Sequence, residues 1–194
     1  MLFIDFETRS ELDLREVGLW NYARHPSTDV WCMAHALDDG EPSLAPIAGH
    51  TFAEASLHGA LHYVKSGGAV AAHNAPFELE IWNTIMVPRH GWPRLAPEQA
   101  SCTLAMSYAM GLPGALEDVA YALGLRFQKD VMGYNLMLRF ARPWRRDPVK
   151  WMDENPSFTL GGVKSPGAEG LARLQESCRQ DVRVDREVPS RLMP

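Results

Sequence analysis

Cysteines, long apolar runs and an excess of basic residues are all scarce in this sequence, and each shortage excludes a class of protein. The 194 residues contain three cysteines, an odd number, at widely separated positions. They fit neither a disulfide framework nor a zinc site, so we expect buried free thiols at Cys32, Cys102 and Cys178. No apolar run approaches the roughly 20 residues that span a bilayer, so we expect no membrane partner.

The charge balance is slightly acidic. Lys and Arg number 19 and Asp and Glu number 24, which gives a formal net charge of −5. This balance disfavours a protein that coats nucleic acid through charge alone. It does not exclude an enzyme that meets phosphate through bound metal ions. The amino terminus has the pattern of a strand rather than of a cleavable signal, so we expect a cytoplasmic protein.

The order of the predicted elements indicates the fold class. Length and an ordinary hydrophobic content of 46% predict one domain, residues 1–194. Apolar alternation predicts strands at 2–6 and 69–74 and a hairpin over 30–47. Helical spacing predicts helices over 51–68, 76–86, 101–112, 114–125, 133–141 and 168–188. Segments 87–99 and 142–170 are predicted to be irregular. Early strands followed by helices predict an α/β domain with a mixed sheet covered by helices.

The opening stretch "MLFIDFETRS" places two carboxylates, Asp5 and Glu7, two positions apart in an apolar strand. Side chains at i and i+2 project from the same face of a strand. Two carboxylates side by side repel each other and are costly to desolvate unless a cation lies between them. Spacing alone leaves open the alternative that both acids point into water at a strand end.

Two further acidic positions lie far from the first pair. In "AHNAPFELEIW", Asn74 and Glu78 follow a predicted strand, and open α/β sheets place functional groups at the carboxyl ends of strands. In "ESCRQDVRVDREV", Asp181 lies among the core-facing positions of the terminal helix, where a carboxylate needs a partner. Each acid taken singly also fits a structural role, Glu78 on a helix surface and Asp181 in an ion pair with Arg173 or Arg183.

Three neighbouring acids show no such pattern. Asp185 and Glu187 are predicted to be ordinary solvated charges, and Glu80 serves as an internal comparison for Glu78.

The motifs in combination resemble a known group of nucleases. "DFETRS", "AHNAPFE", "LPGALEDVAYALGL", "QKD" with "GYNLM", and "CRQDV" resemble the DEDD superfamily of 3′–5′ exonucleases. More closely, they are similar to the proofreading exonuclease domain of phage-type family A DNA polymerases, over about residues 1–188. The resemblance implies a ribonuclease-H-like fold, a mixed central β-sheet flanked by α-helices. It also implies a bacterial or phage-infected cell as the setting.

By that resemblance, Asp5, Glu7, Glu78 and Asp181 are the catalytic carboxylates of a site for two Mg²⁺ or Mn²⁺ ions. Asp5 would bridge both ions, Glu7 and Asp181 would complete the water-activating ion's site, and Glu78 would hold the other ion. Members commonly have Asp where Glu78 stands, so its contact is expected to differ. The implied reaction hydrolyses DNA from the 3′ end to nucleoside 5′-monophosphates.

The resemblance also implies substrate contacts. Thr8 would hydrogen-bond the terminal nucleotide, and Asn74 would touch its sugar or phosphate. Phe77 would contact substrate or belong to the core, and His73 is predicted to be a satisfied structural residue. Basic and aromatic residues alternate over residues 139–151, which suits either a path for single-stranded DNA or a solvated loop.

The sequence departs from the family at the position of a water-orienting tyrosine, where it has Ser177. Glu176 occupies the position of the histidine that the other subtype uses. Three accounts stay open: a weakened enzyme, substitution by another residue such as Tyr134 or Glu176, or a domain that binds DNA without cutting it quickly.

The polymerase domain that follows in the family is absent from this sequence, so we expect an excised domain or a separate exonuclease acting beside a polymerase. The expected partners are single-stranded DNA or the 3′ ends of duplex DNA. A catalytically impaired nucleic-acid- or polymerase-binding module and an RNA-directed 3′–5′ exonuclease are the alternative functions.

Overall fold

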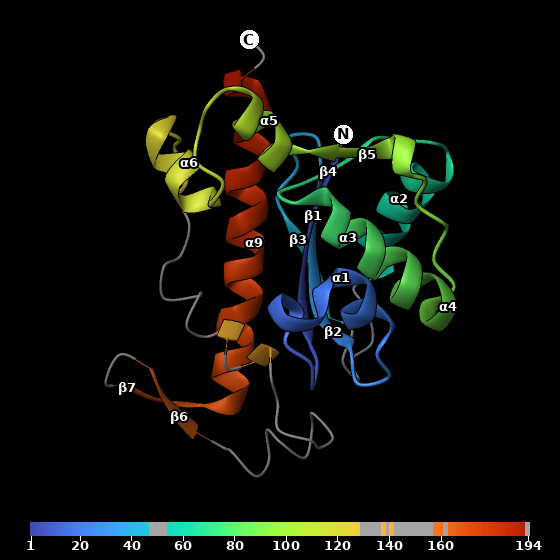
Figure 1. The fold of residues 1–194 in the computed structure, drawn as a ribbon, viewed down its shortest axis with the longest axis vertical. Helices are drawn as coiled ribbons and strands as arrows, with labels where there is room; N and C mark the ends of the chain where they lie inside the picture. The colour runs from blue at the N-terminus through green and yellow to red at the C-terminus, as the bar shows by residue number, and fades with distance from the viewer. Residues whose placement is uncertain (47–53, 129–136, 139, 142–156, 161–162, 193–194) are drawn as a thin grey trace.

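The computed structural model describes residues 1–46, 54–128, 137–138, 140–141, 157–160 and 163–192. In this part of the chain a mixed five-stranded sheet has the strand order β3-β2-β1-β4-β5 (Figure 1). The strands are β1 (Leu2–Arg9), β2 (Asp29–Leu37), β3 (Ser43–Pro46), β4 (Val70–Ala72) and β5 (Ala100–Cys102). β1–β2 and β2–β3 are antiparallel pairs, whereas β1–β4 and β4–β5 are parallel. The predicted mixed α/β sheet is confirmed.

Helices cover both faces of this sheet. They are α1 (Leu14–Arg24), α2 (Glu54–Lys65), α3 (Ala75–Ile81), α4 (Val87–His90), α5 (Thr103–Ala109), α6 (Leu116–Ala122) and α9 (Gly167–Leu192). A π-helical turn (Trp82–Met86) joins α3 to α4, and a short 3-10 turn (Pro97–Gln99) precedes β5. The long helix α9 lies along β1 and β2, with α5 and α6 beside it (Figure 1). β6 (Ser157–Leu160) and β7 (Val163–Pro166) form a separate antiparallel pair.

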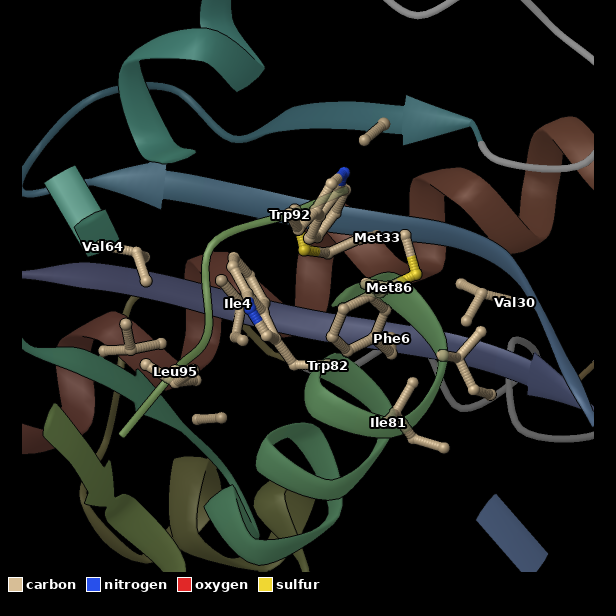
Figure 2. Packing of buried hydrophobic residues seen from close by; sticks show 14 of the residues in the cluster. Ile4, Phe6, Val30, Met33, Val64, Ile81, Trp82, Met86, Trp92 and Leu95 are labelled. Carbon is tan, nitrogen blue, oxygen red and sulfur yellow. The ribbon is translucent and has the colours of Figure 1, made fainter. Parts of the chain in front are cut away.

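The alternation of β1 divides its side chains between two layers of core. Leu2, Ile4 and Phe6 point to the face covered by α1, α2, α3 and the π-helical turn (Figure 2). There the Phe6 ring lies 6.3 Å from that of Trp82, whose indole N–H donates to the Pro93 carbonyl at 2.8 Å. Burying large aromatic rings with a satisfied N–H is a main source of stability in a domain of this size.

The opposite face of β1 is turned toward α9. Phe3 packs there with Cys178 and Val182 of the helix, in a smaller apolar cluster than that of the first face. By the same alternation Asp5 and Glu7 project to this side. The two acids at i and i+2 therefore lie between the sheet and α9 rather than at a strand end in open solvent.

Several predicted elements have different bounds in the structure. The helix predicted over 101–112 begins only at Thr103, because residues 100–102 form β5, a three-residue strand of small side chains that carries no alternation. The irregular reading of 142–170 is wrong for β6 and β7 and for the start of α9, and residues 142–156 lie outside the described residues. Segment 87–99 contains α4 and a 3-10 turn. Of the helix predicted over 133–141, residues 137–138 and 140–141 are helical and the others lie outside the description.

None of the helices in the described part of the chain is long and apolar enough to cross a bilayer.

Candidate active site

A cavity of about 410 Å³ lies beside the last residues of β1 and the end of β4. Its walls come from β1, α1, the β4–α3 junction, residues 137, 138 and 141, and α9, which are distant segments of the sequence. All eight residues predicted for the site line this cavity: Asp5, Glu7, Thr8, Asn74, Phe77, Glu78, Ser177 and Asp181. The fold thus brings them together, while their roles as ligands and substrate contacts stay predictions.

The β1 acids form one wall of the cavity next to α9. A carboxylate oxygen of Asp5, one of Glu7 and the Sγ of Cys178 lie within 4.8 Å of one another. The Cys178 thiol donates to the Asp5 backbone carbonyl at 3.3 Å, which ties the strand to the helix. Burial raises the pKa of this thiol well above its usual value, so it stays a neutral donor beside the two carboxylates.

Glu78 is held at the start of α3 by the turn that follows β4. Asn74 adopts a left-handed conformation (φ 85°), which Asn tolerates better than most residues and which lets the chain turn sharply into the helix. Glu78 is then 4% exposed, and its Oε2 has no hydrogen-bond partner among the described residues. Burial, and secondly the charge of Asp5, raise the pKa of Glu78 well above its usual value. A buried carboxylate with an unused oxygen beside like charges is a group that a nearby cation would stabilise.

Asp181 enters the cavity from α9. Ser177 and Asp181 lie four residues apart on one face of the helix, and both are buried. On the neighbouring turns Leu174, Cys178 and Val182 are fully buried, which fixes the rotation of the helix about its axis. Arg183, one of the two cations considered as a partner of Asp181, pairs with Glu176 at 2.8 Å and Glu41 at 3.6 Å.

The prediction for Asp185 is wrong. Asp185 is only 3% exposed, accepts a hydrogen bond from the Thr103 hydroxyl, and lies 3.9 Å from Nδ1 of His73. Burial raises the pKa of Asp185 to about 7. The cause is tertiary: α9 has α5 and α6 on its outer side, so a helix position outside the apolar stripe is also covered.

The predictions for His73, Glu187 and Glu80 have different outcomes. The His73 ring hydrogen-bonds the Thr103 hydroxyl at 3.0 Å and the Gly114 carbonyl at 2.8 Å, as expected of a structural histidine. Glu187 is half-buried rather than solvated and accepts from the Arg126 backbone N–H at 2.9 Å. Glu80, the comparison for Glu78, forms an ion pair with Arg24 and is not part of the cavity lining.

The structure shows whether the residues considered as substitutes for the missing tyrosine line the cavity. Glu176 is exposed, pairs with Arg179 and Arg183, and is not part of the cavity lining, so it does not fit that role. Tyr134 lies outside the described residues. Of the basic and aromatic stretch at 139–151, Phe140 is fully buried, and its carbonyl accepts from the Trp31 indole at 2.9 Å. Phe140 is therefore a core residue, and the rest of the stretch that bears charge is not described.

Tyr22 is a cavity residue that the sequence patterns missed. It lies in α1, a polar segment with scattered leucines for which the sequence patterns predicted no element, and its hydroxyl lies 2.9 Å from the Thr8 hydroxyl. Its ring centroid lies 6.4 Å from that of Phe77, which both lines the cavity and packs on the core. An aromatic residue in the first helix after the acidic strand is too weak a pattern to have identified it.

The donor set of the cavity fits a hard divalent cation. The four predicted carboxylates would offer the oxygen ligands that Mg²⁺ and Mn²⁺ prefer, and the unused buried oxygen of Glu78 is the kind of atom that a cation satisfies. Arg15 is the one Lys or Arg among the residues described as lining the cavity, so the carboxylates outnumber local cations.

Comparisons with known proteins bear on the fold and on the relatives of this chain. No family model matches the chain. Over 193 residues the chain is 31% identical to a protein named "DNA polymerase" from Bacillus phage SP02, covering 98% of this chain and 28% of that protein. The chain thus spans little more than a quarter of that relative. A solved structure described as "apo form of the nuclease" superposes with a TM-score of 0.54 at 16% identity, covering 98% of this chain and 70% of that one. The chain has an α/β, ribonuclease-H-like fold.

Proposed function

We propose that this chain is a metal-dependent 3′–5′ exonuclease of the DEDD type that hydrolyses DNA to nucleoside 5′-monophosphates. One observation carries the proposal: four carboxylates from three distant segments converge on a single cavity, and the most buried of them has an unused oxygen. Similarity to a phage protein named "DNA polymerase" supports a role on DNA. Proofreading or end trimming beside a polymerase, in the cytoplasm of a bacterial or phage-infected cell, is the setting we infer.

We assign different roles to the residues of the cavity. Asp5, Glu7, Glu78 and Asp181 would hold two Mg²⁺ or Mn²⁺ ions, which when bound supply the charge that activates water and stabilises the leaving oxygen. Thr8 and Asn74 offer polar contacts for the terminal nucleotide. The half-buried apolar side chains of Leu12, Leu14 and Phe77 offer a surface for its base.

Ser177 is the reason to expect slow hydrolysis of DNA. Ser177 lines the cavity, and it stands at the sequence position where the family has a water-orienting tyrosine, whose side chain is longer. A slow exonuclease follows, because loss of a water-orienting group lowers the rate without removing the carboxylates. The same observation favours a second candidate function, a module that binds DNA with almost no turnover.

The test uses two acids of the same helix. Glu78→Gln removes a carboxylate from the cavity, and Glu80→Gln removes the nearby carboxylate that pairs with Arg24 outside it. Each variant is incubated with 5′-labelled and 3′-labelled single-stranded DNA in Mg²⁺ or Mn²⁺. We expect mononucleotide release from the 3′ end, a loss of at least about 100-fold in Glu78→Gln, and less than about twofold change in Glu80→Gln.

The other outcomes separate the alternatives. DNA binding without cleavage by the wild-type chain under either metal overturns the exonuclease and establishes the binding module. Faster cleavage of an RNA strand of the same sequence in direct competition reassigns the substrate to RNA. Equal losses in the two glutamine variants contradict the assignment of Glu78 to the site.

A further inference from the structure

Two hydroxyls form a pair in the wall of the cavity, next to Glu7. The Tyr22 hydroxyl of α1 lies 2.9 Å from the Thr8 hydroxyl of β1, and both residues line the cavity. Tyr22 is only 4% exposed, and its ring lies against that of Phe77. The pair is therefore built into the wall and is not a contact of mobile surface side chains.

The cavity lies at the end of β1, and residues from both faces of the strand reach it there. Asp5, Phe6, Glu7 and Thr8 are consecutive residues of β1, and all four line the cavity. The pairing of β1 with β2 changes register between Glu7 and Thr8, where Trp31 is an additional residue of β2. Such a bulge bends the strand that carries the extra residue, which here is β2.

The backbone of α1 places Tyr22 opposite Thr8. Gly18 has φ 74°, a conformation that suits glycine, and it divides α1 so that the second half carries Tyr22 in a new direction. The Thr28 hydroxyl donates to the Tyr22 carbonyl at 2.6 Å and anchors that half to the start of β2. Tyr22 is thus fixed through both its backbone carbonyl and its ring.

The hydrogen count of the pair leaves one donor for the cavity. Two hydroxyls carry two O–H groups, and their mutual hydrogen bond uses one of them. Neither Thr8 nor Tyr22 has another side-chain hydrogen-bond partner among the described residues. Burial, assisted by the nearby Glu7 charge, raises the pKa of Tyr22, so the phenol keeps its proton and the count holds at neutral pH. One O–H therefore stays available beside the Glu7 carboxylate.

A donor and an acceptor side by side match a group that both accepts and donates, and a sugar hydroxyl is such a group. Among the sugar oxygens at the 3′ end of a DNA strand, the terminal 3′-hydroxyl alone has this character, because internal 3′ oxygens are esterified and ring oxygens carry no hydrogen. We propose that Tyr22 is a positioning residue that holds Thr8, so that the hydroxyl pair donates to the terminal 3′-hydroxyl while Glu7 accepts from it. This inference rests on the proposed exonuclease function and names the part of the substrate that the Tyr22 side of the cavity recognises.

The experiment compares Tyr22→Phe, Thr8→Val and the double variant on two strands of one sequence, ending in a 3′-hydroxyl or a 3′-hydrogen. Tyr22→Phe keeps the ring contact with Phe77 and removes only the hydroxyl. Tyr121→Phe, at an exposed position of α6, is the matched control. Cleavage gives KM and kcat, and fluorescence anisotropy in metal-free buffer gives binding.

On the 3′-hydroxyl strand we expect Tyr22→Phe to lower kcat/KM by about five- to tenfold, the effect of one hydrogen bond, while the control stays within twofold. The double variant should lose no more than the stronger single variant, because the two hydroxyls act as a unit. On the 3′-hydrogen strand the wild-type chain should already be slow, and Tyr22→Phe should change it little. Equal losses of Tyr22→Phe on both strands, additive losses, or no loss at all would overturn the proposal.

Binding separates this inference from the proposed function. A wild-type chain that cuts neither strand overturns the exonuclease, and the anisotropy comparison still decides the role of Tyr22. Preferential binding of the 3′-hydroxyl strand that disappears in Tyr22→Phe supports it. The absence of such a preference in the wild-type chain, or its persistence in Tyr22→Phe, refutes it.

Discussion

Asp185 makes the stability of this protein depend on pH. Its carboxyl group is buried against Thr103 and His73, and its pKa rises from 3.8 to about 7, because of burial first and the charges of Asp5 and Asp181 as well. Each pKa unit corresponds to 1.36 kcal/mol, so a shift of roughly three units corresponds to about 4 kcal/mol.

The sign follows from the direction of the shift. A folded-state pKa above the unfolded value means that the folded protein binds the proton more tightly. The contribution to stability is complete below about pH 4 and is lost as the pH rises through about 7. Above that pH the folded state contains a buried charge that the unfolded state would solvate.

Replacement of Asp185 by Asn removes this dependence. The amide keeps an oxygen that accepts from the Thr103 hydroxyl but carries no charge at any pH. We expect the free energy of unfolding of Asp185→Asn to be close to wild type at about pH 4, higher by about 1.5 kcal/mol at pH 5 and higher by about 4 kcal/mol at pH 8. Urea titrations followed by tryptophan fluorescence, in EDTA and at intervals from about pH 4 to 8, measure the difference.

A second variant should act in the opposite direction. The Thr103 hydrogen bond lowers the pKa of Asp185, so Thr103→Val should leave a less stable protein whose stability falls more steeply with pH. Parallel curves for the wild-type chain and Asp185→Asn over the whole range would refute the reasoning, because they would mean that the folded state does not hold this carboxyl group in its neutral form.

Two further predictions concern DNA binding and rate. Arg15→Ala should weaken DNA binding several-fold and reduce the slope of log K against log salt by about one, because Arg15 is the one Lys or Arg in the described lining; a KCl titration with an unchanged slope would contradict a phosphate contact. Ser177→Tyr should raise kcat by at least about tenfold if only the water-orienting phenol is missing, with Ser177→Ala near wild type; single-turnover rates that do not increase would show that another defect limits the reaction.

Local patterns in the sequence were sufficient for the central strand, the hairpin, the helix over 76–86 and the terminal helix. In each case the spacing of apolar residues reports the face that is buried, whatever element covers it. The convergence of Glu78 and Asp181 on the Asp5 and Glu7 pair followed from resemblance and agrees with the cavity. Their separate patterns also fitted ordinary surface and ion-pair roles, so no single segment could have established the site.

Other features depended on contacts between distant segments. β5 is recognisable only by its pairing with β4, since three small residues carry no periodicity. Thr8 meets Tyr22 in the cavity wall, where their hydroxyls lie 2.9 Å apart, only because α1 folds back beside the end of β1. Tyr22 belongs to the site because a break at Gly18 redirects α1.

The two aspartates of α9 show most clearly what the sequence determined and what the tertiary structure decided. Asp181 and Asp185 are one helical turn apart, and the sequence assigned one to the site and the other to solvent. The pattern of one helix records its own apolar stripe, and that stripe correctly turned Asp181 toward the sheet. Whether a position beside the stripe is also buried depends on which helices pack on the outer side of α9, here α5 and α6. At Asp185 it depends as well on the hydrogen bond that the Thr103 hydroxyl donates. Burial is a property of the assembled layers, so the charge state of Asp185 was decided only when the chain had folded.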